Sequence, residues 1–126
     1  MLRLFLTRTL TGRHAGSVKV FLHLREGVTP ASFAATVVRQ IDSGETKAWE
    51  VVRRRPLTIR HKGRFKSAVT IKPAPRRRIP ADHASPDLVA QMTGKDSGFV
   101  LRYFAGLLAM KLGRKLRGFY VPVHEA

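Results

Sequence analysis

Residues 18–25 read VKVFLHLR, in which aliphatic residues alternate with charged or aromatic ones. A period of two residues is typical of a β-strand, because successive side chains of a strand point to opposite faces of the sheet. The segment is therefore predicted to be a strand. Its aliphatic side consists of Val18, Val20, Leu22 and Leu24, and its other side of Lys19, Phe21, His23 and Arg25.

A similar alternation precedes this strand. Leucines at positions 2, 4 and 6 alternate with Arg3, Phe5 and Thr7, and the turn-forming residues TGRHAG separate the two segments. A strand or a hairpin is expected here. The same N-terminal segment has arginines, hydroxyl side chains and no acid before Glu26, so it also resembles a mitochondrial targeting segment.

The segment GVTPASFAATVVRQIDSG, residues 27–44, is predicted to form an amphipathic helix. Thr29 suits the N-cap, Pro30 suits the first helical position, and Gly44 suits the end. Phe33, Val37 and Ile41 recur every four residues and form one apolar stripe that can pack on the strands.

A second helix is expected over residues 45–55, ETKAWEVVRRR, with its basic end stopped by Pro56. Trp49 and Val52 are three residues apart and would anchor one face of this helix to the core. The helix end would then present Arg53, Arg54 and Arg55 together.

Residues 57–73, LTIRHKGRFKSAVTIKP, leave two interpretations open. A hairpin would place four apolar residues on one face and three cations on the other, whereas an irregular arm would become ordered only on its partner. The apolar residues are Leu57, Ile59, Val69 and Ile71, and the cations are Arg60, Lys66 and Lys72. The proline-rich sequence PAPRRRIP follows as a linker.

Two further helices are predicted near the C-terminus. A short one starts at Ser85 and Pro86 and ends near Gly94, and a longer, largely apolar one covers residues 97–118. Small residues recur at positions 105, 109 and 113 of the longer helix. This helix either packs on its own domain or docks on a partner protein.

The charge of the chain indicates a polyanionic partner. Its 126 residues include 24 Lys and Arg against 8 Asp and Glu, for a net charge of +16. The 31 residues between Glu50 and Asp82 contain no acid and eleven of these cations, which is the pattern of a nucleic-acid-binding segment. The predicted RNA-binding residues are Arg53, Arg54, Arg55, Arg60, Lys62, Arg64, Lys66, Lys72, Arg76, Arg77 and Arg78.

The sequence offers little for other chemistry. There is no cysteine, and no two of the five histidines have metal-ligand spacing, so neither a metal nor another cofactor is expected. Asp82 next to His83 could belong to a small nuclease, but a general acid and base need a second positioned partner, so the protein is predicted not to be an enzyme. The longest apolar stretch, residues 99–112, is shorter than the roughly 20 residues of a membrane span.

The order of these features resembles the S-twenty-one family of small ribosomal subunit proteins, in its mitochondrial form with N- and C-terminal extensions. The likeness covers roughly residues 17–70: a strand ending in Arg25 and Glu26, a helix opening near Pro30, a break at Gly44, and the motif EVVRRR at residues 50–55. The resemblance implies a structural constituent of the small ribosomal subunit that binds ribosomal RNA in the mitochondrion, or alternatively in a bacterial cytoplasm. Neighbouring ribosomal proteins would be partners, through the C-terminal helix.

The expected architecture is a small, mainly helical α+β fold of the extended ribosomal-protein type. Residues 1–56 would form a strand and helix core, residues 57–84 a basic arm and linker, and residues 85–126 a C-terminal helical extension. The alternative function is that of a free-standing nucleic-acid-binding protein, of a phage or plasmid, that acts on a nucleoprotein machine.

Overall fold

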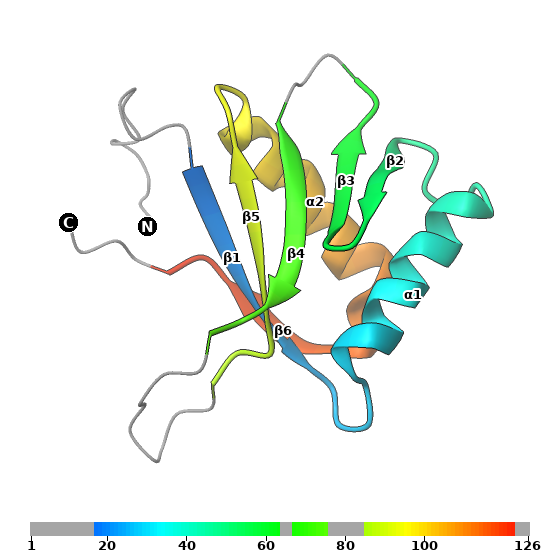
Figure 1. The fold of residues 1–126 in the computed structure, drawn as a ribbon, viewed down its shortest axis with the longest axis vertical. Coiled ribbons are helices and arrows are strands. Elements are labelled where there is room, and N and C mark those ends of the chain that lie inside the picture. Colours follow the sequence, from blue (N-terminus) through cyan, green and yellow to red (C-terminus); the bar gives the residue numbers. More distant parts are fainter. Residues whose placement is uncertain (1–16, 64–66, 76–84, 123–126) are drawn as a thin grey trace.

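A six-stranded antiparallel sheet runs through the computed structural model, which describes residues 17–63, 67–75 and 85–122 (Figure 1). The strand order is β2-β3-β4-β5-β1-β6, so the first and the last strand of the described chain lie side by side. The elements in sequence order are β1 (Ser17–Leu24), α1 (Pro30–Asp42), β2 (Trp49–Arg54), β3 (Leu57–His61), β4 (Ala68–Pro73), β5 (Leu88–Thr93), α2 (Ser97–Lys111), a 3₁₀ turn (Gly113–Lys115) and β6 (Leu116–Tyr120).

Strand β1 confirms the prediction made from its alternating sequence. Val20, Leu22 and Leu24 are buried, whereas Lys19 is exposed and Phe21 is half-buried. The strand pairs with β5 on one side and with β6 on the other. The core therefore lies on the aliphatic side of β1.

Helix α1 also forms where it was predicted. The Thr29 hydroxyl accepts a hydrogen bond from the Ser32 backbone N–H, and the Ser32 hydroxyl accepts one from the Thr29 backbone N–H, both at 3.0 Å. This reciprocal capping box satisfies two backbone donors at the helix start. After the helix ends, Gly44 adopts a φ of 86°, a left-handed conformation that favours glycine.

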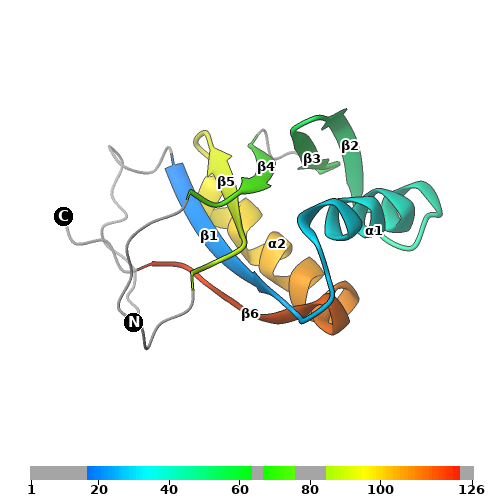
Figure 2. The same ribbon diagram turned by 60° about the horizontal axis from the view of Figure 1, so that its bottom comes forward.

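Both helices lie on the same side of the sheet (Figures 1 and 2). Phe33 and Val37 of α1, and Val100 and Phe104 of α2, are buried in one core with the inward residues of the strands. The Trp49 ring of β2 meets the Phe104 ring of α2 edge to face, with centroids 6.2 Å apart. One face of the sheet therefore carries the core.

The expectation of a mainly helical fold is wrong. Of the residues that the structure describes, 33% are helical and 38% are in strands, which makes this a sheet-rich α+β fold. Residues 45–55 do not form a helix: turns lead into strand β2, in which Trp49 and Val51 face the core side opposite His61 and Ile59. Valine and tryptophan fit a pleated sheet well, and pairing with β3 outweighs the weak helical spacing of Trp49 and Val52.

The two C-terminal helices were predicted only in part, because the longer one begins at the predicted residue, as α2, but ends early, and the shorter one does not form. Residues 88–93 form strand β5 instead of a short helix, because this segment pairs with β4 on one edge and β1 on the other. Helix α2 ends at Lys111, and residues 116–120 form strand β6.

Of the two interpretations of residues 57–73, the hairpin is the one observed. Strands β3 and β4 turn Leu57, Ile59, Val69 and Ile71 inward, and all four are buried. The predicted N-terminal strand lies outside the described residues.

Truncation of the core should show how much stability depends on the contact between α2 and the sheet. Phe104 is fully buried, so Phe104→Ala is expected to lower the free energy of unfolding by about 3–5 kcal/mol. Met110, on the same helix, is 81% exposed, so Met110→Ala should change it by less than about 0.5 kcal/mol. Urea denaturation followed by far-ultraviolet circular dichroism measures both; equal losses would contradict this packing.

Candidate nucleic-acid interface

The face of the sheet opposite the core is covered by neither α1 nor α2 (Figure 2). Residues directly opposite one another in antiparallel strands share a face, so the strand registers place each outward side chain. We call this surface the open face. Among the described residues it comprises the outward positions of all six strands.

Among the strand residues that the register pairs, four cations from four different strands lie on the open face: Lys19 of β1, Arg53 of β2, Arg60 of β3 and Lys72 of β4. All four side chains are exposed. The strand registers link these positions one after another. Arg53 lies opposite Thr58, and Thr58 lies opposite Thr70. Gln91 lies between Thr70 and Lys19 and is directly opposite both of them. These five residues form one row across the sheet with a cation at each end.

Neutral polar side chains fill the space between these cations. Thr58 and Thr70 contact each other through their hydroxyl groups at 3.4 Å, and the Gln91 side-chain amide donates a hydrogen bond to the Ser17 hydroxyl at 3.3 Å. Hydroxyl and amide groups of this kind bind phosphate and sugar oxygens in nucleic-acid complexes. The row is therefore suited to a polyanion along its whole length.

Glu50 is the one acid among the outward strand residues in the described part of the chain. Its Oε2 accepts hydrogen bonds from Nε of Arg60 at 2.9 Å and from Nη2 at 2.6 Å. Both side chains are partly exposed, so the pair adds little stability. Its main effect is to neutralise one of the four cations.

The three consecutive arginines do not act as one cluster. Arg53 lies on the open face, whereas Arg54 lies opposite Leu57 and bonds through its guanidinium to the Asp42 carboxylate of α1 at 3.4 Å. Arg55 lies in the turn between β2 and β3. The prediction that a helix end presents all three together is wrong, because successive residues of a strand point to opposite faces.

The remaining predicted RNA-binding residues divide into two groups. Lys62 is exposed just after β3. Arg64, Lys66, Arg76, Arg77 and Arg78 lie outside the described residues, as do Asp82 and His83.

Sequence reasoning missed an aromatic cluster at the β6 end of the open face. The Tyr120 ring lies 5.6 Å from the Phe21 ring and 5.8 Å from the His23 ring, measured between centroids. We call these three side chains the aromatic cluster. The alternation of residues 18–25 places Phe21 and His23 on one side, but only the pairing of β1 with β6 brings Tyr120 beside them.

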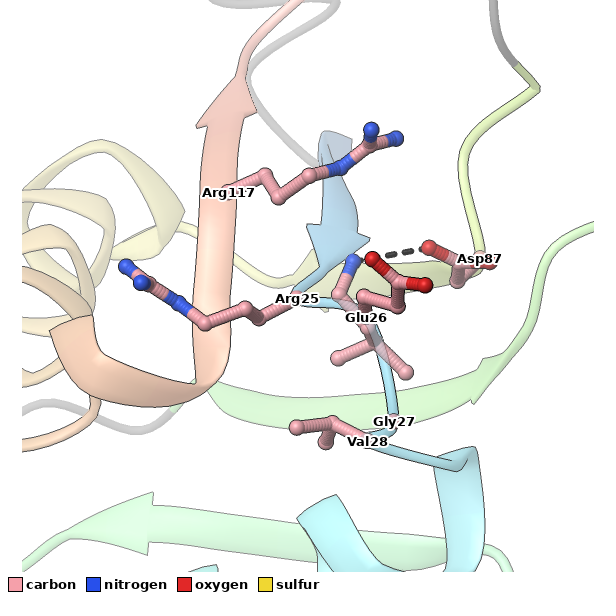
Figure 3. Close-up of a pocket in the computed structure, with 7 residues that line it drawn as sticks. Arg25, Glu26, Gly27, Val28, Asp87 and Arg117 are labelled. Carbon is pink, nitrogen blue, oxygen red and sulfur yellow. Dashed lines mark hydrogen bonds between the residues drawn. The ribbon is translucent and has the colours of Figure 1, made fainter.

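A shallow pocket at one end of β1 contains charges of both signs (Figure 3). Arg25, Glu26, Asp87 and Arg117 line it, and Figure 3 shows the Arg25 side chain extending away from the two carboxylates. The Asp87 carboxylate accepts a hydrogen bond from the Leu24 backbone N–H at 2.7 Å. Because Asp87 is already engaged in holding β1 and acids face the pocket, the pocket is a poorer anion site than the open face.

Within the ranges that the structure describes, no group of three His, Asp or Glu side chains gathers as a metal site would require. None of the described helices is long and apolar enough to cross a membrane. The chain matches no family model, no curated protein and no solved structure.

Removal of the acid tests whether the open face takes the RNA that the sequence leads us to expect. The variant Glu50→Gln releases Arg60 and removes a negative charge, so affinity for a single-stranded RNA should rise several-fold at low salt. The slope of log affinity against log salt should steepen by about 0.7, the contribution of one added phosphate contact. Filter binding between 50 and 200 mM salt measures both; weaker binding by Glu50→Gln would exclude this arrangement.

Proposed function

We propose that this protein binds RNA, without catalysis, through the open face of its sheet. The observation that carries the proposal is the placement of four cations on one helix-free face, one on each of four strands, with a single acid among the described outward residues. Phosphate contacts of this kind release counterions and supply affinity that does not depend on sequence.

The dimensions of the face suit an extended polyanion. Neighbouring strands are about 4.8 Å apart, so the row from Arg53 to Lys19 spans four strand intervals, or roughly 19 Å. A backbone that follows this row meets an arginine at one end and a lysine at the other. Arg60 and Lys72 flank the row on either side, because they belong to the neighbouring rows of β3 and β4.

The assembly in which this RNA is bound is proposed from the sequence resemblance. The strand and helix of that resemblance are present as β1 and α1, while the motif of residues 50–55 lies in β2 and the following turn. On this basis the protein is a structural constituent of a small ribosomal subunit, in the mitochondrion, with ribosomal RNA and neighbouring ribosomal proteins as partners. The alternative, a free-standing nucleic-acid-binding protein, uses the same face.

Two adjacent arginines provide a matched test of the open face. Arg53→Gln should weaken RNA binding and reduce the salt slope by about 0.7, because one phosphate contact is lost. Arg54→Gln makes the same change in charge on the side of β2 that faces Asp42, and should leave the slope nearly unchanged. Equal effects of the two variants would show that only net charge matters and that the open face has no special role.

Sedimentation distinguishes a ribosomal constituent from a free-standing nucleic-acid-binding protein. A ribosomal constituent should co-migrate with small subunits in a sucrose gradient of a native lysate at moderate salt. Migration near the top of the gradient, as free protein, would reject the ribosomal assignment and leave the free-standing binder. Treatment of the lysate with ribonuclease is the control, since it should move a ribosomal constituent from the small-subunit fractions to the top of the gradient.

A further inference from the structure

The aromatic cluster continues the cationic part of the open face. Tyr120 lies directly opposite Phe21, Phe21 opposite Val89, and Val89 opposite Lys72, so these four residues form a second row across β6, β1, β5 and β4. Lys19 precedes Phe21 by two residues on the same face of β1. Rings and ammonium groups are therefore neighbours on one surface.

Burial in a core does not account for this cluster. Tyr120 is 45% exposed, and it lies on an edge strand, on the side of the sheet that carries neither helix. The neighbouring inward positions of β1, in contrast, are occupied by aliphatic side chains that are buried under the helices. The Tyr120 ring is exposed, and its contacts with Phe21 and His23 hold it in place on the surface. It therefore presents a flat ring to solvent and does not fill the core.

Flat rings beside cations suit a ligand that has both planar groups and negative charge. Unpaired nucleotides have both, because each base presents a face for stacking and each is joined to a phosphate. A base inside a duplex has both faces covered by its neighbours and offers none to a protein ring. Duplex RNA could still use the cations, but not the aromatic cluster.

We propose that the aromatic cluster stacks unpaired bases, so that the open face binds single-stranded nucleic acid in preference to duplex. This inference rests on the proposed RNA-binding function and specifies that the nucleic acid is single-stranded. The base lies against Tyr120, with an adjoining phosphate directed toward Lys19, while Lys72, three strands away in the same row, meets a phosphate further along the nucleic acid. Stacking tolerates any base, so selectivity is for strand form and not for sequence.

The test compares two tyrosines of similar exposure on opposite sides of the sheet. Tyr120→Leu removes the exposed ring of the cluster, while Tyr103→Leu makes the same change on α2, where the ring is 48% exposed. Fluorescence anisotropy would use a mixed-sequence single-stranded RNA, the same sequence in a hairpin duplex, a single-stranded DNA, and inorganic polyphosphate as a polyanion without bases.

The wild-type protein should bind the single-stranded RNA more tightly than the hairpin. Tyr120→Leu should lower affinity for the single strand by about tenfold, the scale of one base stacked on an aromatic ring, without changing the salt slope or the affinity for polyphosphate. Tyr120→Phe should keep wild-type affinity, because it keeps the ring. Tyr103→Leu should bind like the wild type.

The outcomes separate this inference from the function on which it rests. Equal binding of single strand and hairpin, or an unchanged affinity of Tyr120→Leu, would overturn the stacking role, while a reduced salt slope of Arg53→Gln would still support RNA binding. Failure of the wild type to bind any of the nucleic acids would overturn both. Tighter binding to DNA than to RNA would keep the stacking role and reject RNA as the natural strand.

A measurement on the unmodified protein guards against misfolding of the variant. Ultraviolet cross-linking of 4-thiouridine RNA to the wild type, followed by peptide mapping, should place the cross-links in peptides that contain β1 and β6. Cross-links confined to α1 or α2 would overturn the proposal independently of any substitution.

Discussion

Strand β1 pairs with β5 along one edge and with β6 along the other, and the rest of the structure depends on this double pairing. It joins the C-terminal strand to the strand that begins the described chain and closes the core under Leu22, which is fully buried. Because side chains alternate along a strand, the register that buries Leu22 also directs Lys19, Phe21 and His23 outward. The register of β1 thus determines both which residues form the core and which residues form the open face.

The cations of the open face repel one another, and a bound polyanion would remove this repulsion. With a net charge of +16, like charges repel one another in the folded chain, and Glu50 offsets only Arg60 among the cations of this face. Placing one cation on each of four strands keeps these charges apart, with threonine and glutamine side chains between them. A bound nucleic acid would neutralise the same cations, so binding would also stabilise the fold.

Sequence patterns predicted the elements whose signals are local. The alternation of residues 18–25 and the capping residues Thr29 and Gly44 identified β1 and α1, because strand periodicity and helix caps depend on neighbours in sequence. They failed at Trp49–Arg54 and Leu88–Thr93, where the spacing was ambiguous and the strand conformation comes from partners elsewhere in the chain. For the same reason the basic segment could be identified, but not the separation of Arg53 from Arg54.

The sequence by itself determined that the chain is strongly basic, that it folds around at least one strand and one capped helix, and that its cations concentrate between Glu50 and Asp82. Only the tertiary structure decided which of these cations share a surface and that Tyr120 joins Phe21 and His23. The physical reason is that cross-strand register joins residues as far apart as positions 21 and 120, and no pattern within a single segment records which distant strand will pair with it.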